Sequence, residues 1–391
     1  MGFDKAYFDA GVNRIGTDCE KWDGMIAQTQ DPDMIPMWVA DMDFRSAPAI
    51  EEALAGVLAW GTWGYTISGE RDAKALCDYW ARRHDMVFAP ENVAMSPCVV
   101  TGLRIAVRTL TNEGDGVLIN PPVYGPFFAS IRENGRKIVE SPLVRGEDGR
   151  YNLNLEDMEG KLASREAKAV MLCSPHNPCG RAWKDEELQA VVSLCVKYDV
   201  PLICDEIHAD FVYQPAKHRS ILSFEGAKDV AVMLCAASKT FNVAGLQQSS
   251  IVCLNPEVLE KLKHEMDAPG VRSGNAFALA ATRAAYTSCD EWLDGLKDYL
   301  AENRDYTVDF IEKHMPKIRV TPLDATYLMW LDCRALGLEQ PELMERILAQ
   351  HVKVNDGLFF GEMGRGFIRL NIACPRAQLH SALERLAAAL A

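Results

Sequence analysis

Five short apolar segments between residues 116 and 254 constrain the fold of this chain more than any other feature. They read GVLINPP, AVMLCSP, VPLICDE, VAVMLCAAS and SSIVCL, and helix-like stretches separate the first three. Their apolar residues are consecutive rather than alternating, which is typical of strands in a parallel sheet with helices on both faces. The order strand, helix, strand therefore predicts an α/β architecture with right-handed crossovers.

Apolar residues at helical spacing predict the helices that flank this sheet. The pattern occurs over residues 47–60 and 70–84, a third helix is expected to begin near Thr101, and another occupies about 125–134. A further helix is expected in KDEELQAVVSLCVKYD, between the second and third apolar segments.

The pattern changes after about residue 290. A long helical stretch over 291–314 and a helix near 340–351 accompany two strand-like segments, RVTPLDATYLMWLDC and GFIRLNIACP. A chain of 391 residues is also too long for one small core. We therefore expect a large domain over residues 46–288, and a smaller α+β domain formed by residues 1–45 together with 289–391.

Composition limits the classes of partner. The net charge of −14 argues against nucleic acid or an anionic membrane as the main partner. The twelve cysteines are scattered without a C-x-x-C pair, so no metal site is predicted. The N-terminus lacks the apolar core of a signal peptide, and no apolar run approaches the ~20 residues that span a bilayer. We expect a cytoplasmic protein that acts on a small molecule.

Unusual polar residues follow three of the predicted strands, in SPHNPCG, CDEIHAD and ASKTFN. The carboxyl ends of parallel strands are where such sheets bind ligands. Asn177 precedes Pro178 and is equally suited to a turn. Asp205 ends a buried strand, where a carboxylate needs a cation or strong donors; a helix cap or a core ion pair would also supply these. His208 has the alternative of a satisfied core histidine.

Lys239 stands among small and apolar neighbours in AASKTFNVAGLQ. Either its ammonium group extends to solvent, or it serves as a neutral amine that forms a Schiff base with a carbonyl group. One ligand would use all these groups: a pyridine ring whose nitrogen pairs with Asp205, whose phenolic oxygen meets Asn177 and His208, and whose aldehyde meets Lys239. The helix start in CVVTGL would bind its phosphate.

These motifs resemble those of the fold-type I pyridoxal-phosphate enzymes, in the aminotransferase class I/II superfamily. SPHNPCGRAW, CDEIHADFVY and SKTFNVAGLQ occur in the family's order, and the likeness runs from about residue 30 to the end. More narrowly, PMWVADMDF, WGYT, PPVYGPF and the DEIH and AGLQ variants resemble the MalY/PatB group of cystathionine β-lyases. The resemblance implies a large domain with a mostly parallel seven-stranded sheet.

The resemblance also implies roles around the cofactor, pyridoxal 5'-phosphate. Lys239 would bond to its aldehyde and later act as the base at the substrate Cα. Asp205 would hold the ring nitrogen, and Asn177 would bond the phenolic oxygen, with His208 nearby. Tyr124 would stack on the ring. Asn177 would also contact the substrate.

Four further positions would hold the phosphate, and one would hold the substrate. Ser238 and the amides of Val100 and Thr101 would bind the phosphate, joined by Tyr65 of the neighbouring subunit, which implies a homodimer with shared active sites. Arg369 would bind the substrate carboxylate with its fork of donors. Lys239, Tyr124 and Tyr65 are the residues expected to be catalytic.

Two replacements and one segment bear on the choice within the superfamily. Many relatives carry Arg where this chain has Gln247, and Tyr where it has His208; both replacements fit the β-lyase group. Ala40 lies in IPMWVADMDF, which is either a buried strand and turn or a border of the substrate site that moves as the small domain closes.

The leading hypothesis is a carbon–sulfur β-lyase: cystathionine β-lyase activity that converts L-cystathionine or a cysteine-type substrate to a thiol, pyruvate and ammonia, as in methionine biosynthesis. An aminotransferase would use the same residues, although one specific for dicarboxylates would need a second arginine that we cannot assign. A third alternative is a non-catalytic regulatory or binding protein. The intact set Lys239, Asp205, Asn177 and Arg369 argues against it.

Overall fold

The computed structural model describes residues 2–268, 270 and 274–391. Its largest sheet has seven strands in the order β2-β10-β9-β8-β7-β3-β4, and only β10 runs antiparallel to its neighbours. This confirms the predicted mostly parallel α/β sheet. The strands are β2 (Val93–Ser96), β3 (Gly116–Ile119), β4 (Lys137–Glu140), β7 (Ala169–Cys173), β8 (Leu202–Asp205), β9 (Ala231–Cys235) and β10 (Ser249–Val252).

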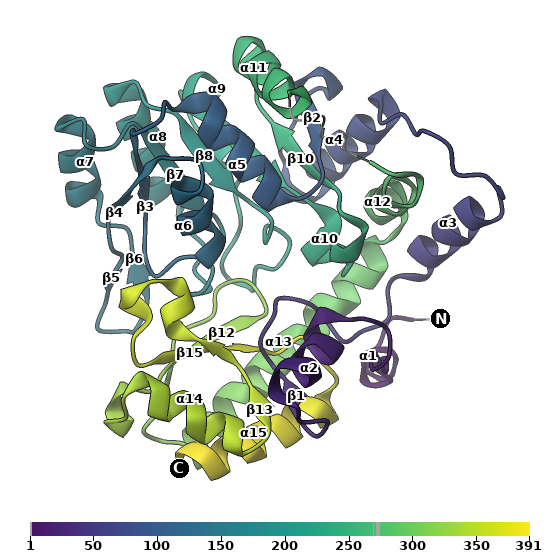
Figure 1. Cartoon of the computed structure of the whole chain (residues 1–391), viewed down its shortest axis with the longest axis vertical. Helices are drawn as coiled ribbons and strands as arrows, with labels where there is room; N and C mark the ends of the chain where they lie inside the picture. The colour runs from purple at the N-terminus through teal and green to yellow at the C-terminus, as the bar shows by residue number, and fades with distance from the viewer. Residues whose placement is uncertain (1, 269, 271–273) are drawn as a thin grey trace.

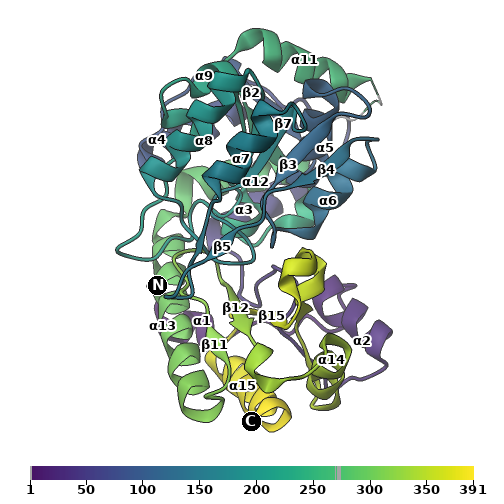
Figure 2. The same ribbon diagram turned by 90° about the vertical axis from the view of Figure 1, so that its left-hand side faces the viewer.

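Helices cover both faces of this sheet, which explains the consecutive apolar residues of its strands (Figures 1 and 2). On β7, Ala169 and Met171 belong to one core, whereas Val170 and Leu172 belong to the other. The first core is completed by α5 (Val99–Leu110), α6 (Gly125–Arg132) and α11 (Pro256–Asp267). The second includes α4 (Glu70–His84), α7 (Leu155–Ala163), α8 (Asp185–Tyr198) and α12 (Ala276–Ser288).

A second lobe contains a four-stranded antiparallel sheet in the order β11-β12-β15-β14 (Figure 2). Its elements are α13 (Asp290–His314), β11 (Arg319–Val320), β12 (Leu328–Asp332), α14 (Gln340–Ala349), β14 (Asn355–Asp356), β15 (Phe367–Asn371) and α15 (Arg376–Leu390). The N-terminal segment joins this lobe, because β1 (Ile35–Pro36) pairs in parallel with β13 (Val352–Lys353). The arrangement supports the division into residues 46–288 and residues 1–45 with 289–391, which stays a prediction.

The remaining elements are short or lie at the periphery. They are α1 (Lys5–Asp9), α2 (Met25–Thr29), α3 (Pro48–Leu58), β5 (Val144–Arg145), β6 (Tyr151–Asn152), α9 (Ala227–Val230) and α10 (Ala237–Thr240). Among the described residues, no helix combines the length and apolar character needed to cross a membrane.

One local prediction needs correction. The third helix begins at Val99 rather than near Thr101, because the extended backbone of Cys98 already forms its N-cap. In the second lobe, all five residues of β15 are buried, because both faces of this strand are covered.

Candidate active site

A cavity of about 550 Å³ lies at the carboxyl ends of the central strands and is lined by residues of both lobes. It brings together nine of the predicted site residues: Ala40, Val100, Tyr124, Asn177, Asp205, His208, Ser238, Lys239 and Arg369. Two others do not line it. Thr101 lies one residue beyond the lining segment, with its hydroxyl 3.3 Å from the sulfur of Cys98, and Tyr65 is fully exposed.

Lys239 lies in the single turn of α10, which directly follows β9 and so projects from the carboxyl end of the sheet. Its ammonium group does not extend to solvent: Nζ donates a hydrogen bond to the carbonyl of Ala40 over 2.6 Å. Burial lowers the pKa of this lysine, against the nearby charge of Asp41, which raises it. Because a lower pKa enlarges the neutral fraction, Lys239 is suited to act as a nucleophile.

Asp205 is the last residue of β8 and only 2% exposed. Its carboxylate accepts a hydrogen bond from the backbone amide of Ile207 over 3.1 Å, and it forms no ion pair with a described residue. Burial raises its pKa to about 7, and the Ile207 amide opposes this shift. The carboxylate is therefore neither a helix cap nor part of a core ion pair, and it suits a cation placed in the cavity.

Arg369 and Asn177 meet at the inner end of the cavity, where each is 3% exposed. Arg369 donates from Nη1 to the side-chain oxygen of Asn177 over 2.9 Å and from Nη2 to the carbonyl of Trp38 over 3.0 Å. Burial lowers the pKa of the guanidinium to about 10, and its Nε has no partner among the described residues. One face of the guanidinium packs over the ring of Phe360, 4.8 Å from the ring centroid.

His208 and Tyr124 line the same cavity from different elements. Burial lowers the pKa of His208 to about 3, so its imidazole is neutral at pH 7, and its Nδ1 has no partner among the described residues. Burial also raises the pKa of Tyr124 to about 12, which keeps its hydroxyl protonated. Both groups can therefore donate a hydrogen bond to an anionic oxygen of a ligand.

The N-terminus of α5 supplies Val99 and Val100 to the cavity wall. The helix lies close to the sheet because residue 102 is a glycine: a Cβ there would stand 2.6 Å from the side chain of Leu234. Backbone amides at a helix start, with the hydroxyl of Ser238 in the same cavity, suit a phosphate group.

The donor and acceptor set of the cavity fits pyridoxal 5'-phosphate. Asp205 is buried without a cation, His208 has an unpartnered ring nitrogen, and Lys239 has a lowered pKa. These groups match a ring nitrogen, a phenolic oxygen and an aldehyde, and the start of α5 matches the phosphate.

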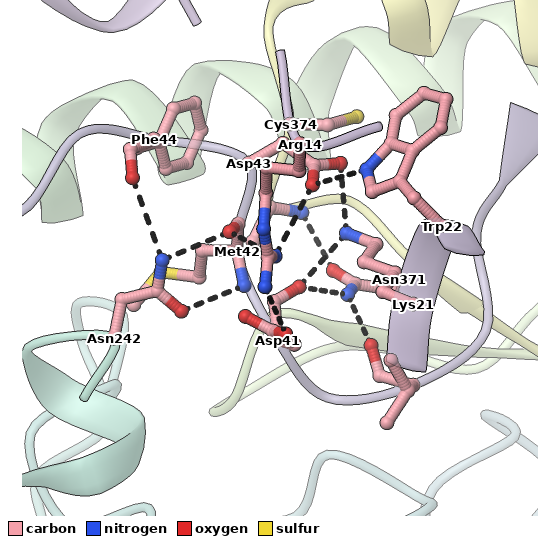
Figure 3. Close-up of polar contacts among 12 residues, drawn as sticks. Arg14, Lys21, Trp22, Asp41, Met42, Asp43, Phe44, Asn242, Asn371 and Cys374 are labelled. Atoms are coloured by element: carbon pink, nitrogen blue, oxygen red, sulfur yellow. Dashed lines mark hydrogen bonds and ion pairs between the residues drawn. The ribbon is translucent and has the colours of Figure 1, made fainter. Parts of the chain in front are cut away.

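A junction segment, residues Trp38–Phe44, connects the lobes and lines the cavity with its first four residues. Figure 3 shows the polar contacts around its residues Asp41–Phe44. Side chains from several elements bind its backbone. Asn371 donates to the carbonyls of Val39 and Asp41 over 2.7 and 2.8 Å, two residues along β15 from Arg369. Ala40, which was predicted to contact substrate, places its carbonyl against Lys239.

The large lobe holds the other end of the junction segment through Asn242. The amide of Asn242 donates to the carbonyl of Met42 over 2.8 Å, and its oxygen accepts from the Met42 N–H over 3.0 Å (Figure 3). Lys21 and Asp43, each 1% exposed, form a buried ion pair of 2.8 Å beneath the segment. The segment is therefore part of the cavity wall rather than a simple buried strand.

Thirteen lining residues were not among the predicted site residues, and they include Glu20, Trp38, Asp41, Asn355 and Phe359. Trp38 and Asp41 lie in the motif IPMWVADMDF, and the prediction that Ala40 of this motif contacts substrate could have been extended to them. Nothing in the local sequence distinguishes Glu20, Asn355 and Phe359, because β-strand pairing and lobe packing bring them to the cavity.

Comparison with known proteins agrees with this geometry. Residues 67–386 match the family model for aminotransferase class I and II. The chain is 40% identical to cystathionine beta-lyase PatB of Bacillus subtilis, over 98% of this chain and 99% of that protein, and 32% identical to protein MalY of Escherichia coli, over 97% of each.

Solved structures show the same relationship. Cystalysin of Treponema denticola, which contains pyridoxal 5'-phosphate, matches with a TM-score of 0.94 and 33% identity over 98% of each chain. A pyridoxal-phosphate-bound putative aminotransferase of Clostridium difficile matches with a TM-score of 0.94 and 36% identity, over 98% of this chain and 99% of that one. By sequence, structure and the residues gathered in its cavity, the chain belongs to the aminotransferase class I and II family.

Proposed function

We propose that this protein is a pyridoxal-phosphate-dependent carbon–sulfur β-lyase, which converts L-cystathionine or a similar cysteine thioether to a thiol, pyruvate and ammonia. The observation that carries the proposal is the meeting of Lys239, Asp205, Asn177 and Arg369 in one cavity of a chain 40% identical to a cystathionine β-lyase. All four side chains needed for the chemistry are present, which also argues against a non-catalytic binding protein.

When bound, the cofactor withdraws electrons from the Cα of the amino acid attached to it, so that the Cα–H bond weakens and a thiolate can leave from Cβ. Asp205 keeps the ring nitrogen protonated, because a buried carboxylate gains most from a cation in contact with it. The amine of Lys239 takes the proton from Cα; its lowered pKa provides the neutral form.

The other residues orient the reacting groups. Arg369 binds the substrate carboxylate with two parallel donors, exchanging its present contacts with Asn177 and the Trp38 carbonyl. Asn177 and His208 donate to the phenolic oxygen, Tyr124 covers the ring, and the start of α5 with Ser238 binds the phosphate. These assignments are part of the proposal.

The aminotransferase alternative has one specific observation in its favour, the likeness to a putative aminotransferase of Clostridium difficile. The charges in the cavity argue against a dicarboxylate aminotransferase, which would need a further cation to bind the second carboxylate. Among its described lining residues the cations are Lys239 and Arg369, and both already have a role. Among the described residues, no second arginine lines the cavity.

The two functions differ in their need for an acceptor. A β-lyase releases pyruvate at every turn, whereas an aminotransferase needs a keto acid to continue. We therefore expect steady pyruvate and thiol production from L-cystathionine without added keto acid, and loss of nearly all turnover in Lys239→Ala. If turnover stops after about one equivalent and resumes with 2-oxoglutarate, the aminotransferase takes the place of the lyase.

We further propose a homodimer that completes each site with Tyr65 of the partner subunit. Tyr65 lies on the exposed segment between α3 and α4, on the outer edge of the large lobe (Figure 1), with Trp60, Trp63 and Ile67 also exposed. An exposed apolar stretch of this kind is typical of a protein interface. A cytoplasmic role in methionine biosynthesis completes the proposal. Eleven of the twelve cysteines are buried as free thiols, which suits a reducing compartment.

A further inference from the structure

Two carboxylates line the candidate active site in addition to Asp205. Glu20 is exposed and begins a short helical turn over Glu20–Gly24, and Asp41 is half-buried in the junction segment. The charges of both reach the amine of Lys239, since each raises the pKa of that lysine against the larger effect of burial.

Exposure orders the residues along the cavity. Asp205, Asn177 and Arg369 are at most 3% exposed and form its inner end, whereas Glu20 is exposed and Phe359 is 48% exposed at its opening. A substrate whose carboxylate lies on Arg369 therefore directs the group beyond its sulfur toward the opening. The walls there carry Glu20, Asp41 and two aromatic rings, those of Trp38 and Phe359.

Two cations lie near this opening but are not part of the cavity wall. Arg14 forms an ion pair of 2.8 Å with Asp41, and Lys353 lies over the Trp38 ring, 4.3 Å from its centroid, but neither lines the cavity. Glu20 enters none of the ion pairs between described residues. Arg369 binds the substrate carboxylate and Lys239 acts at Cα, so the charged lining residues that remain for the rest of the substrate are the carboxylates Glu20 and Asp41.

We propose that Glu20, assisted by Asp41, makes the enzyme select cysteine thioethers by the charge beyond sulfur, favouring an ammonium group and disfavouring a lone carboxylate. L-cystathionine, which carries both charges at that end, would turn its distal ammonium toward Glu20. This inference rests on the proposed lyase function. A single screened charge pair at the edge of a protein changes kcat/KM by about three- to tenfold.

Three substrates of similar length test the proposal with the holoenzyme: S-(2-aminoethyl)-L-cysteine, S-propyl-L-cysteine and S-carboxymethyl-L-cysteine. Pyruvate formation gives kcat/KM for each. Because their thiols differ as leaving groups, the decisive quantity is the change in the cation-to-anion ratio caused by Glu20→Gln. We expect this variant to lower the ratio about three- to tenfold, and added salt to lower it in the native enzyme.

Asp18→Asn is the matched control. Asp18 lies two residues before Glu20 and does not line the cavity, so the substitution removes one negative charge near the opening without changing its wall. It should leave the ratio unchanged. If the neutral thioether yields pyruvate and Glu20→Gln leaves the ratio as it was, the selectivity proposal is wrong and the lyase function stands. A higher cation-to-anion ratio in Glu20→Gln than in the native enzyme also overturns it. If L-cystathionine yields pyruvate and none of the three analogues does, the selectivity proposal is wrong and the lyase function stands; if L-cystathionine yields none either, both fail.

Discussion

The carboxyl group of Asp205 has opposite consequences for stability and for activity. Burial raises its folded pKa from 3.8 to about 7, so its charged form is disfavoured in the folded apoprotein. The resulting loss of stability is absent below pH 4, grows as pH rises, and is complete above pH 7. Asp205→Asn should therefore stabilise the apoprotein by about 1–4 kcal/mol at pH 8, and by less at pH 5. The activity of the holoenzyme should nevertheless be lost.

Urea unfolding of the apoprotein at the two pH values measures this effect. Asp332 provides a control with the opposite sign, because it also ends a strand but is paired with Arg334 and Arg145. Burial alone would raise the pKa of Asp332, but the hydrogen bonds from Arg334 outweigh it and the pKa is lowered, so Asp332→Asn should destabilise the protein at pH 8. A stability of Asp205→Asn below that of the native apoprotein at pH 8 would show that Asp205 has a stabilising partner.

Arg369 combines a charge with a rigid fork of donors, and the second property is the one that a lysine lacks. Arg369→Ala should reduce kcat/KM for amino acids by an amount that corresponds to about 2–4 kcal/mol of lost transition-state stabilisation. Arg369→Lys should recover only part of this loss. Cofactor binding, followed by visible absorbance, should survive in both variants. If amines without a carboxylate react as well as amino acids in the native enzyme, the role of Arg369 has been misassigned.

At the level of elements, the junction segment depends on Asn242, which holds it to the large lobe. Asn242 has a positive φ of 56°, so Asn242→Gly keeps the backbone conformation while it removes the side-chain bonds to Met42. We expect KM for the substrate to rise about tenfold, because Ala40 and the Trp38 carbonyl lose their fixed position. Steady-state kinetics of the holoenzyme, with KM and kcat separated, measure this.

Asn303→Ala is the matched variant for this prediction. Asn303 is fully buried in α13 and donates to the carbonyls of Ile372 and Cys374, each over 2.9 Å, away from the cavity. Its loss should lower stability and leave KM unchanged. Equal changes in KM for both variants would mean that Asn242 contributes general stability rather than position.

For the whole molecule, the exposed position of Tyr65 leads us to predict that two copies of the chain form a dimer with shared active sites. Tyr65 is exposed and does not line the cavity of its own chain, so the proposed shared site requires a second copy. Tyr65→Ala and Lys239→Ala should each be nearly inactive, but mixed dimers would contain one site with both residues intact. Mixing the two variants under conditions that exchange subunits should restore about a quarter of native activity.

Size-exclusion chromatography with light scattering checks that the samples are dimers before and after mixing. Tyr151→Ala mixed with Lys239→Ala is the control, because Tyr151 is buried within one chain and does not line the cavity. That mixture should not exceed the summed activity of its parts. An inactive mixture of Tyr65→Ala and Lys239→Ala in which subunits have exchanged would place Tyr65 in its own chain's site or outside any site.

The sequence by itself determined five strands of the large sheet, several of the helices that flank it and the residues that follow its strands. Consecutive apolar residues in β7, β8 and β9 are a local property, since each strand must bury both faces, and chain order then places Asn177, Asp205 and Lys239 at one edge of the sheet. The tertiary structure alone decided what stands opposite them. The carbonyl of Ala40 lies 199 residues from Lys239 in sequence, and Asn355 and Glu20 reach the cavity through lobe packing. Such contacts depend on how the surfaces of two lobes pack together. The hydrophobic periodicity of either segment is a local property and does not specify that packing.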